Sequence, residues 1–493
     1  MEQPLRAMRW WPVTLAAVVV VLGGGAMAMW LLGVWSPIPT AVSTPERLRL
    51  DRIRTGLTVA AGLAAGVTLL MTMRRQAWSE QAQQFTQLDA VEQRITALYV
   101  AATEQLGSDK AAVRLAGLYA LERLGQDNSK LRQVVVEVWC AYLRMPYTPP
   151  TEVLRRNVKG SPQYAAPDAE APKLEDDQQR REELQVRLTA QRLIAKHLRM
   201  SDKPDDSEQA TYWRDTASER MSVDLVGANL VDFTLASCHA HQLNAESAQF
   251  HGVADLTSAQ FHGDVNLRLA HFHSKAELRE VQFHRYADFS AAHFHGHTDL
   301  SEAHFYYGTN ARAAKFCGDA SLHGVQFYGY AYLFGVQFHG NVNLCSTQFH
   351  DDANLGGAEF QGKFTHIDGS AFYKNADLRM AIFGRNAGLS STKFYGEVNL
   401  RDAAFHGYAD LRGTQFYEDA DLRAQFLRGV DMSGARATST VHLPSGWTLA
   451  DGASTKCELH QVVRTEAKAG GGSTPAFAPA HTSTDQSGRE ELT

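Results

Sequence analysis

The sequence of 493 residues predicts an α+β protein in several regions: two N-terminal transmembrane helices, a short helical segment and a long β-helix with four sides. Three observations carry this prediction. Two stretches near the N-terminus lack charged residues, apolar residues then recur at helical spacing, and large apolar residues recur every five or six positions in the C-terminal half. The content of 44% hydrophobic and 21% charged residues is ordinary for a globular protein.

Residues 1–75 are predicted to form a membrane anchor. Residues 11–35 contain no charged residue, and this length exceeds the roughly 20 residues that a helix needs to cross a bilayer. Residues 55–73 form a second uncharged stretch, which two arginines follow. Tryptophans at both ends of the first stretch are typical of a bilayer interface. A cleaved signal peptide is the alternative for the first stretch, because Ala26-Met27-Ala28 offers a cleavage site.

The cysteines predict which side of the membrane the C-terminal body occupies. Four arginines flank the two stretches and four lie in the loop 36–54, so the positive-inside rule does not decide the orientation. The five cysteines are odd in number and far apart, and no CxxC pair occurs, which argues against a disulfide framework, a zinc motif or a redox motif. We therefore expect a cell-membrane protein whose C-terminal body lies in the cytoplasm.

The middle of the chain predicts a helical region, a linker and a charged helix. Residues 76–145 carry apolar residues at helical spacing in three short helices, similar to a HEAT-like hairpin stack, which can dock on the β-helix, on a partner or on a second copy of the chain. Residues 146–172 hold six of the fifteen prolines and predict a linker. Residues 173–201 predict a helix with a solvated face, and residues 467–493 a disordered tail. The alternating charges of that face are Glu182, Glu183, Arg187, Arg192 and Lys196.

A repeat runs through residues 221–445. From Leu256 to Leu427 large apolar centres alternate at five and six residues, which gives an 11-residue unit in which Leu and Phe take turns. Only Ala311 and Ile367 among these centres are neither Leu nor Phe. The Phe centres are Phe261, Phe272, Phe283, Phe294, Phe305, Phe316, Phe327, Phe338, Phe349 and Phe360, and after one inserted residue Phe372, Phe383, Phe394, Phe405 and Phe416.

The residues around each centre predict short strands separated by corners. A small residue stands two before most centres, Asp or Asn often precedes the Leu, and nine glycines stand two after a Phe. A right-handed helical supercoil also has an 11-residue period, but recurrent Gly, Asp and Asn suit corners better than helix. A small residue two before a large one fits one inward-facing side, and four such sides close a square. The helix before Ser222 and the segment 444–447 are expected to cap the coil.

The motif A-(D/N)-L-x-x, as in Ala254-Asp255-Leu256, resembles the pentapeptide-repeat family over residues 223–432. This resemblance implies a right-handed quadrilateral β-helix. The two apolar stretches, together with residues 113–124 and 187–192, resemble a bacterial membrane-bound subset of the family, which implies an inner-membrane protein. That subset has no assigned activity, so the resemblance implies none for this chain.

The sequence predicts a non-enzymatic scaffold that presents a rigid rod to a protein partner. We find no nucleophile elbow, phosphate-binding loop, dinucleotide-binding glycine pattern or zinc-protease motif, and we expect no cofactor. The alternative to a scaffold is a DNA-mimicking modulator of a topoisomerase, because soluble members of the family that the repeat resembles inhibit DNA gyrase by imitating DNA. Residues 221–445 hold 23 acidic and 16 basic side chains, a small excess compared with the dense charge of a duplex. Direct nucleic-acid binding is not expected.

Histidines follow many of the Phe centres and predict two outward columns if one coil has 22 residues. Seventeen of the twenty histidines lie between residues 239 and 442. We expect surface ring stacking rather than a metal site, because a metal needs several converging ligands rather than a repeated pair. Neighbouring imidazoles in a column would repel each other when protonated, so we expect lowered pKa values for the histidines of both columns. The two columns are His251, His273, His295 and His339, and His262, His284 and His350.

Overall fold

The structure is a computed structural model, and the chain divides into two compact units, Met1–Leu98 and Tyr99–Thr493, each considered by itself. Most of the predicted span 11–35 and all of the predicted tail 467–493 lie outside the described residues. The described residues are 18, 22–26, 29–30, 45–158, 174–200, 212–213, 221–438, 440–450 and 459–465.

A single long helix, α2 (Pro45–Leu106), runs from the first unit into the start of the second. Proline suits the first turn of a helix, where its missing N–H has no intrahelical acceptor. The sequence had predicted a loop at residues 36–54 and a separate short helix after residue 76. Residues 45–54 are helical instead, and α2 continues without a break to Leu106, because residues 74–98 contain neither Gly nor Pro. Among the helices in the described part of the chain, none is long and apolar enough to cross a membrane, so the predicted transmembrane helices are not supported.

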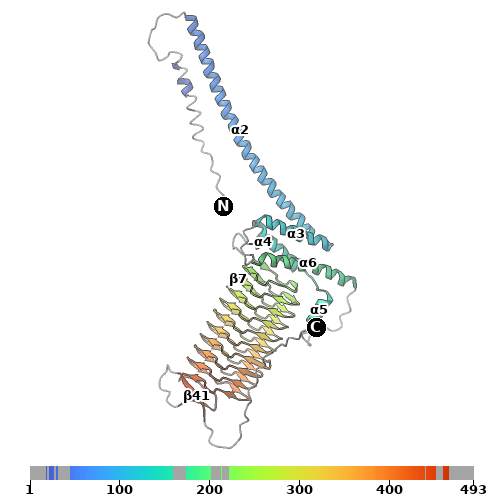
Figure 1. The fold of residues 1–493 in the computed structure, drawn as a ribbon, viewed down its shortest axis with the longest axis vertical. Helices are drawn as coiled ribbons and strands as arrows, with labels where there is room; N and C mark the ends of the chain where they lie inside the picture. Colours follow the sequence, from blue (N-terminus) through green and yellow to red (C-terminus); the bar gives the residue numbers. More distant parts are fainter. Residues whose placement is uncertain are drawn as a thin grey trace, which may run out of the picture. The chain divides into compact units, whose positions relative to one another are not determined.

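The second unit begins with helices that pack together at one end of the β-helix (Figure 1). The predicted helical region ends as expected before Pro146. The predicted linker, in contrast, contains a helix. Thr151 begins it directly after two prolines, and its backbone N–H and hydroxyl both donate to Asp177 Oδ1, at 3.0 and 3.1 Å. The helices are α3 (Ala111–Asp127), the 3-10 helix η1 (Ser129–Leu131), α4 (Arg132–Arg144), α5 (Thr151–Val158) and α6 (Leu174–Leu198).

The prediction that the charges of α6 form a solvated face is wrong for Arg187. This residue is only 3% exposed, and its guanidinium donates to the carbonyls of Leu143 and Met145 and to Glu183. Tyr142 lies under the same guanidinium, 5.6 Å from its carbon to the ring centroid. Leu143 lies in the last turn of α4 and Met145 follows that helix, and Glu183 lies one turn earlier on α6, so α6 packs against the end of α4 with one charged residue buried and paired.

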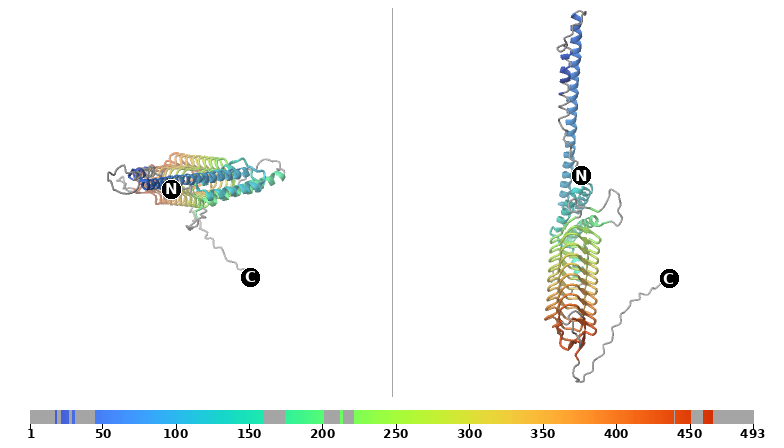
Figure 2. Two further views of the ribbon diagram at one scale, coloured as in Figure 1. Left: turned by 90° about the horizontal axis from the view of Figure 1, so that it is seen from above. Right: turned by 90° about the vertical axis from the view of Figure 1, so that its left-hand side faces the viewer.

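Four parallel sheets form the β-helix, and successive strands of the chain visit them in the order I, II, III and IV (Figures 1 and 2). Within the described residues these sheets have 10, 10, 9 and 12 strands. Sheet I comprises β1 (Val223–Asp224), β4 (Leu243–Asn244), β8 (Val265–Asn266), β12 (Ala287–Asp288), β16 (Thr309–Asn310), β20 (Ala331–Tyr332), β24 (Ala353–Asn354), β28 (Ala376–Asp377), β32 (Val398–Asn399) and β36 (Ala420–Asp421). Sheet II comprises β2 (Asn229–Val231), β5 (Gln249–His251), β9 (His271–Phe272), β13 (His293–Phe294), β17 (Lys315–Phe316), β21 (Gln337–Phe338), β25 (Glu359–Phe360), β29 (Ile382–Phe383), β33 (Ala404–Phe405) and β37 (Gln425–Phe426).

The other two sheets lie on the remaining sides. Sheet III comprises β6 (Ala254–Asp255), β10 (Ala276–Glu277), β14 (Thr298–Asp299), β18 (Ala320–Ser321), β22 (Val342–Asn343), β26 (Phe364–His366), β30 (Asn386–Gly388), β34 (Ala409–Asp410) and β38 (Val430–Asp431). Sheet IV comprises β3 (His239–Ala240), β7 (Gln260–Phe261), β11 (Gln282–Phe283), β15 (His304–Phe305), β19 (Gln326–Phe327), β23 (Gln348–Phe349), β27 (Ala371–Phe372), β31 (Lys393–Phe394), β35 (Gln415–Phe416) and β39 (Arg436–Ala437). Two antiparallel strands, β41 (His460–Arg464) and then β40 (Trp447–Leu449), extend sheet IV at its end.

The pairing register confirms a coil of 22 residues. Ala276 of β10 pairs with Thr298 of β14, and the inserted residue lengthens one coil so that Gln348 pairs with Ala371. The Phe centres stack in two columns inside sheets II and IV. The predicted centre Leu427 is wrong: it is 61% exposed, and Phe426 pairs with Phe405. The corner before β37 has three residues instead of the four before each other strand of sheet II, and a one-residue shift in register moves every side chain to the opposite face.

The corners that follow the Leu centres differ from those that follow the Phe centres. After most Leu centres the second corner residue has a positive φ, for example 58° at Glu302 and 69° at Gly324. The glycines after Phe centres have another reason. A Cβ on Gly329 would lie 2.5 Å from the backbone of Tyr307 in the preceding coil, so this corner needs glycine for close approach rather than for φ.

Both ends of the β-helix are covered, as predicted. At the first coil the side-chain amide of Gln133 on α4 donates to the carbonyl of Ser222 and accepts from its N–H, at 3.1 and 3.0 Å. Gln191 on α6 donates to the carbonyl of Val231 at 3.0 Å. The side chains thus replace a missing strand at an open sheet edge. At the other end β41 pairs with β39, and Trp447 packs against the core.

Candidate interaction surface and histidine cluster

The outward residue after each Phe of sheet IV forms a continuous column of stacked rings. Neighbouring ring centroids lie 4.4 to 5.2 Å apart, and the ring planes are within 13° of parallel. This arrangement confirms the predicted stacking and extends it. The rings are those of His262, His284, Tyr306, Tyr328, His350, Tyr373, Tyr395 and Tyr417.

The second predicted column follows the Phe centres of sheet II. The rings of His251 and His273 lie 4.7 Å apart at 6°, and those of His273 and His295 lie 5.4 Å apart at 2°. Further along, His339 Nδ1 lies 2.8 Å from Gln361 Oε1. The nitrogen lone pairs of an imidazole lie in its ring plane, so rings that stack in parallel do not aim two lone pairs at one ion. Stacking within a column therefore does not make a metal site.

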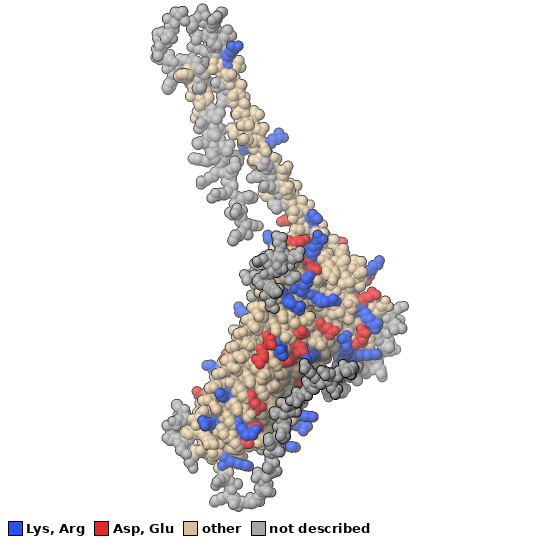
Figure 3. All heavy atoms as spheres, in the orientation of Figure 1, with Lys and Arg blue, Asp and Glu red and all other residues tan. Residues whose placement is uncertain are grey.

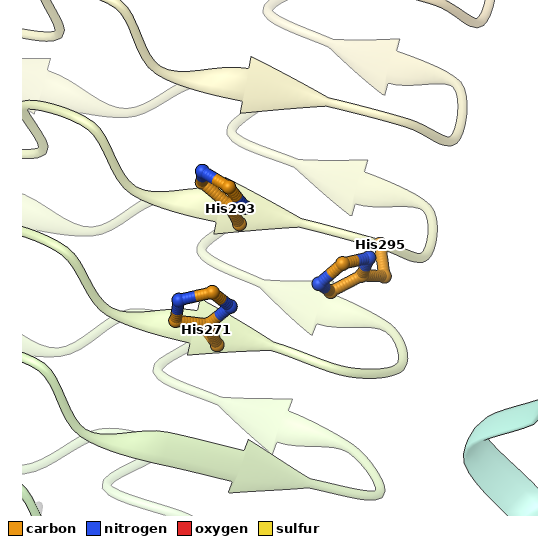
Figure 4. Close-up of side chains that lie close together, drawn as sticks. All are labelled: His271, His293 and His295. Carbon is orange, nitrogen blue, oxygen red and sulfur yellow. The ribbon is translucent and has the colours of Figure 1, made fainter. Parts of the chain in front are cut away.

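Two histidines that the sequence did not single out lie beside this column. His271 of β9 and His293 of β13 stand directly before their Phe centres, and each is outward and paired in register with the other. One ligand atom each of His271, His293 and His295 can be chosen so that all three lie within 4.8 Å of one another (Figure 4). The signal was present in the sequence as His-Phe-His at 271–273 and again 22 residues later.

Burial lowers the pKa values of several histidines in the first coils of sheet II. The pKa of His251 falls to about 4, and that of His293 also falls to about 4. The pKa of His273 falls to about 3, mainly through burial and further through the like charges of neighbouring imidazoles. The direction agrees with the expectation from sequence, whereas burial rather than mutual repulsion is the main cause.

An exposed aromatic cluster lies in the middle of the β-helix, mainly at the corner between sheets IV and I, with Phe334 at the next corner, between sheets I and II. Residues 320–350 contain no Asp, Glu, Lys or Arg. Tyr307 is 59% exposed and Tyr330 is 44% exposed. The ring of Tyr330 lies over Gly308, where a Cβ would come within 2.5 Å of it. We call this cluster the aromatic patch; it comprises Tyr306, Tyr307, Tyr328, Tyr330 and Phe334.

Charged side chains elsewhere on the β-helix are interspersed rather than gathered by sign. On the face in Figure 3, acidic and basic groups are both scattered over the coils. Near the C-terminal end three aspartates each pair with the arginine two residues on, as with Asp410 and Arg412 at 2.6 Å and Asp421 and Arg423 at 2.6 Å. The Arg423 side chain lowers the pKa of Asp421. Each pair neutralises its aspartate locally, and the net acidic excess of the β-helix stays small.

The comparisons with known proteins agree with this architecture. A family model for pentapeptide repeats (9 copies) matches residues 245–293, 289–337 and 379–424, all within the β-helix. No curated protein and no solved structure matched the chain. The 22-residue coils, the four sheets and the family match together identify the chain as a member of the pentapeptide-repeat superfamily.

Proposed function

We propose that this protein is a non-enzymatic interaction module whose β-helix presents the aromatic patch to a protein partner. The fold supports this role in general, because a solenoid leaves only its outward side chains for function. The single observation that carries the proposal is a cluster of five exposed aromatic side chains, three of which (Tyr328, Tyr330 and Phe334) lie in a stretch free of charged residues, 320–350. Tyrosines are enriched in interface hot spots, whereas charged residues are depleted from interface centres.

The patch is held in place before any partner arrives. Tyr306 and Tyr328 stack at 5.2 Å and 2°, and the guanidinium carbon of Arg312 lies 5.9 Å from the ring centroid of Phe334. Tyr330 is packed over Gly308. Ordering mobile side chains costs about 0.5–1.5 kcal/mol each on binding, so a pre-ordered patch binds with less loss of entropy.

The test is site-specific photo-crosslinking of the full-length protein in its native membrane. A photoreactive residue at Tyr330 should crosslink to one protein species, which mass spectrometry then identifies. Tyr307→Arg should abolish that crosslink. Tyr417→Arg is the matched control, because Tyr417 is an exposed tyrosine in the ring column of Tyr306 and Tyr328 but lies several coils beyond the aromatic patch, and it should leave the crosslink intact. Equal loss in both variants, or no crosslink at Tyr330, would exclude the patch as the docking site.

The membrane tether is a further part of the proposal, and the sequence supports it. Residues 11–35 and 55–73 are uncharged, and Arg74 and Arg75 follow the second stretch. Exposed apolar side chains, including Leu57, Leu69 and Met71, lie along the corresponding part of α2. We place the protein in the bacterial inner membrane with its body in the cytoplasm. Release of the full-length protein from membranes by sodium carbonate would exclude an integral tether.

DNA mimicry is the less favoured alternative. A mimic needs acidic groups at nearly the density of duplex phosphates, about one per 1.7 Å. Here the middle of the rod is uncharged, and aspartates near its end pair with arginines. Inhibition of gyrase supercoiling by the purified full-length protein at stoichiometric concentration would favour the mimic over the scaffold.

A further inference from the structure

We propose that His271, His293 and His295 on sheet II form a binding site for one divalent transition-metal ion, with zinc as the ion whose coordination chemistry fits best. The site lies on a different sheet from the aromatic patch, and it does not depend on the proposed interaction function. Three imidazoles with a fourth position left to water match a known zinc coordination set.

The ring geometry favours convergence on one ion. The centroids of His271 and His293 lie 4.7 Å apart with the rings tilted by 48°, and the rings of His293 and His295 lie 6.1 Å apart at 65°. His271 and His295 lie 6.0 Å apart at 22°, so this pair is the one whose rings must turn most for their nitrogens to meet at one ion. Three imidazoles on one tetrahedral ion with nitrogens at about 2.0–2.1 Å place their ring centroids about 5 Å apart. Small rotations of half-buried side chains therefore close the site, and Figure 4 shows the ring of His295 directed toward the gap between the other two.

The backbone supplies the rigidity that a metal site needs. His271 and His293 are paired in register on adjacent strands, and His295 is two residues beyond His293 on the same face. The backbone N–H of His293 donates to the carbonyl of Ala270, and that of His295 to the carbonyl of Phe272, both at 2.8 Å. Ligands on neighbouring strands keep their spacing better than ligands on loops.

The protonation state of the three imidazoles and the charges near them determine the expected affinity for the metal ion. Burial lowers the pKa of all three imidazoles, so each is neutral at pH 7 and keeps a lone pair for ligation. Lys315 occupies the next position after His293 in its column, and its charge opposes a divalent cation. His273, whose ring stacks in parallel on His295, lies on the same face but outside the ligand set.

The test is zinc titration by calorimetry of the purified full-length protein, prepared without a polyhistidine tag, with cobalt(II) absorption as a second readout. We expect one zinc ion per chain and the visible bands of tetrahedral cobalt. His293→Ala and His271→Ala should each weaken zinc binding at least about tenfold. His273→Ala, the matched control, should change affinity by less than about threefold, and Lys315→Gln should tighten binding, because it removes a nearby positive charge.

Thermal melting of each variant checks that the β-helix stays folded, and His293→Asn replaces His293→Ala if the smaller side chain destabilises it. The proposal is overturned if no stoichiometric zinc binding occurs, or if His273→Ala weakens binding as much as His293→Ala. The latter result would mean that the ion binds a stacked pair rather than the three convergent imidazoles.

Discussion

Replacing Phe327 tests the assignment of the core, because this residue lies in the middle of the Phe column of sheet IV. It is 2% exposed, and its ring stacks on Phe305 and on Phe349, at 4.9 Å in each case. Loss of a buried Phe side chain to Ala costs about 3–5 kcal/mol, and each aromatic pair contributes about 0.5–1.5 kcal/mol within that total. Phe327→Ala should therefore lower the free energy of unfolding by about 3–5 kcal/mol, and Phe327→Asp by more, because its carboxylate would be buried without a partner.

The assay is urea denaturation of the full-length protein, followed by far-UV circular dichroism for the sheets and by tryptophan fluorescence for the helical end, where Trp139 and Trp213 stack. Gln326→Ala is the control. Its side chain points outward from the same strand, and we expect a change within about 0.5 kcal/mol. Equal losses in Gln326→Ala and Phe327→Ala, or a loss below about 1 kcal/mol for Phe327→Ala, would show that the inward register is misassigned.

Three further predictions concern topology, pH and the buried arginine. Reporter fusions after Arg75 and after Thr493 should both report the cytoplasm, and labelling of Cys457 by an impermeant thiol reagent in intact cells would contradict this. The pKa of His251 is about 4 when folded and near 6.5 when unfolded, so the unfolded chain binds more protons between these values. Stability should be complete above pH 6.5 and fall by about 3 kcal/mol toward pH 4 through this group alone; a urea midpoint whose loss below pH 6 is unchanged in His251→Asn would refute the assignment. Arg187→Met should cost about 2–4 kcal/mol, because two carbonyls and Glu183 lose their donor, whereas the exposed Arg192→Ala should be nearly neutral in the same denaturation assay.

The sequence predicted the β-helix well because its signal is local and repeated. Each Phe and Leu centre is followed by a corner within three residues, so periodicity alone determines which side chains point inward. The inserted residue before Phe372 was visible for the same reason. Only at Leu427, where a corner is shortened, did the count fail.

The helical end was harder to predict, because its residues depend on partners far away in the chain. Arg187 is buried because carbonyls more than 40 residues earlier accept its hydrogen bonds. Helix α5 formed within a proline-rich stretch because Asp177 caps Thr151. The histidine cluster could be predicted only in part. Position after the Phe centres predicted the column that contains His295, whereas the ligand set also needs His271 and His293, which stand before their Phe centres.

The constant pairing distance of the coils has a consequence for how the chain reaches its folded state. Nearly every strand pairs with a segment about one coil, or 22 residues, away, as in Ala276 with Thr298. The β-helix therefore has a low contact order for an all-parallel β structure, since few contacts require the closure of a long loop. The helices that cover its first coil precede it in the chain, so they leave the ribosome first. Each new coil can then add to a completed one, and folding can proceed during synthesis from the helical end toward β40.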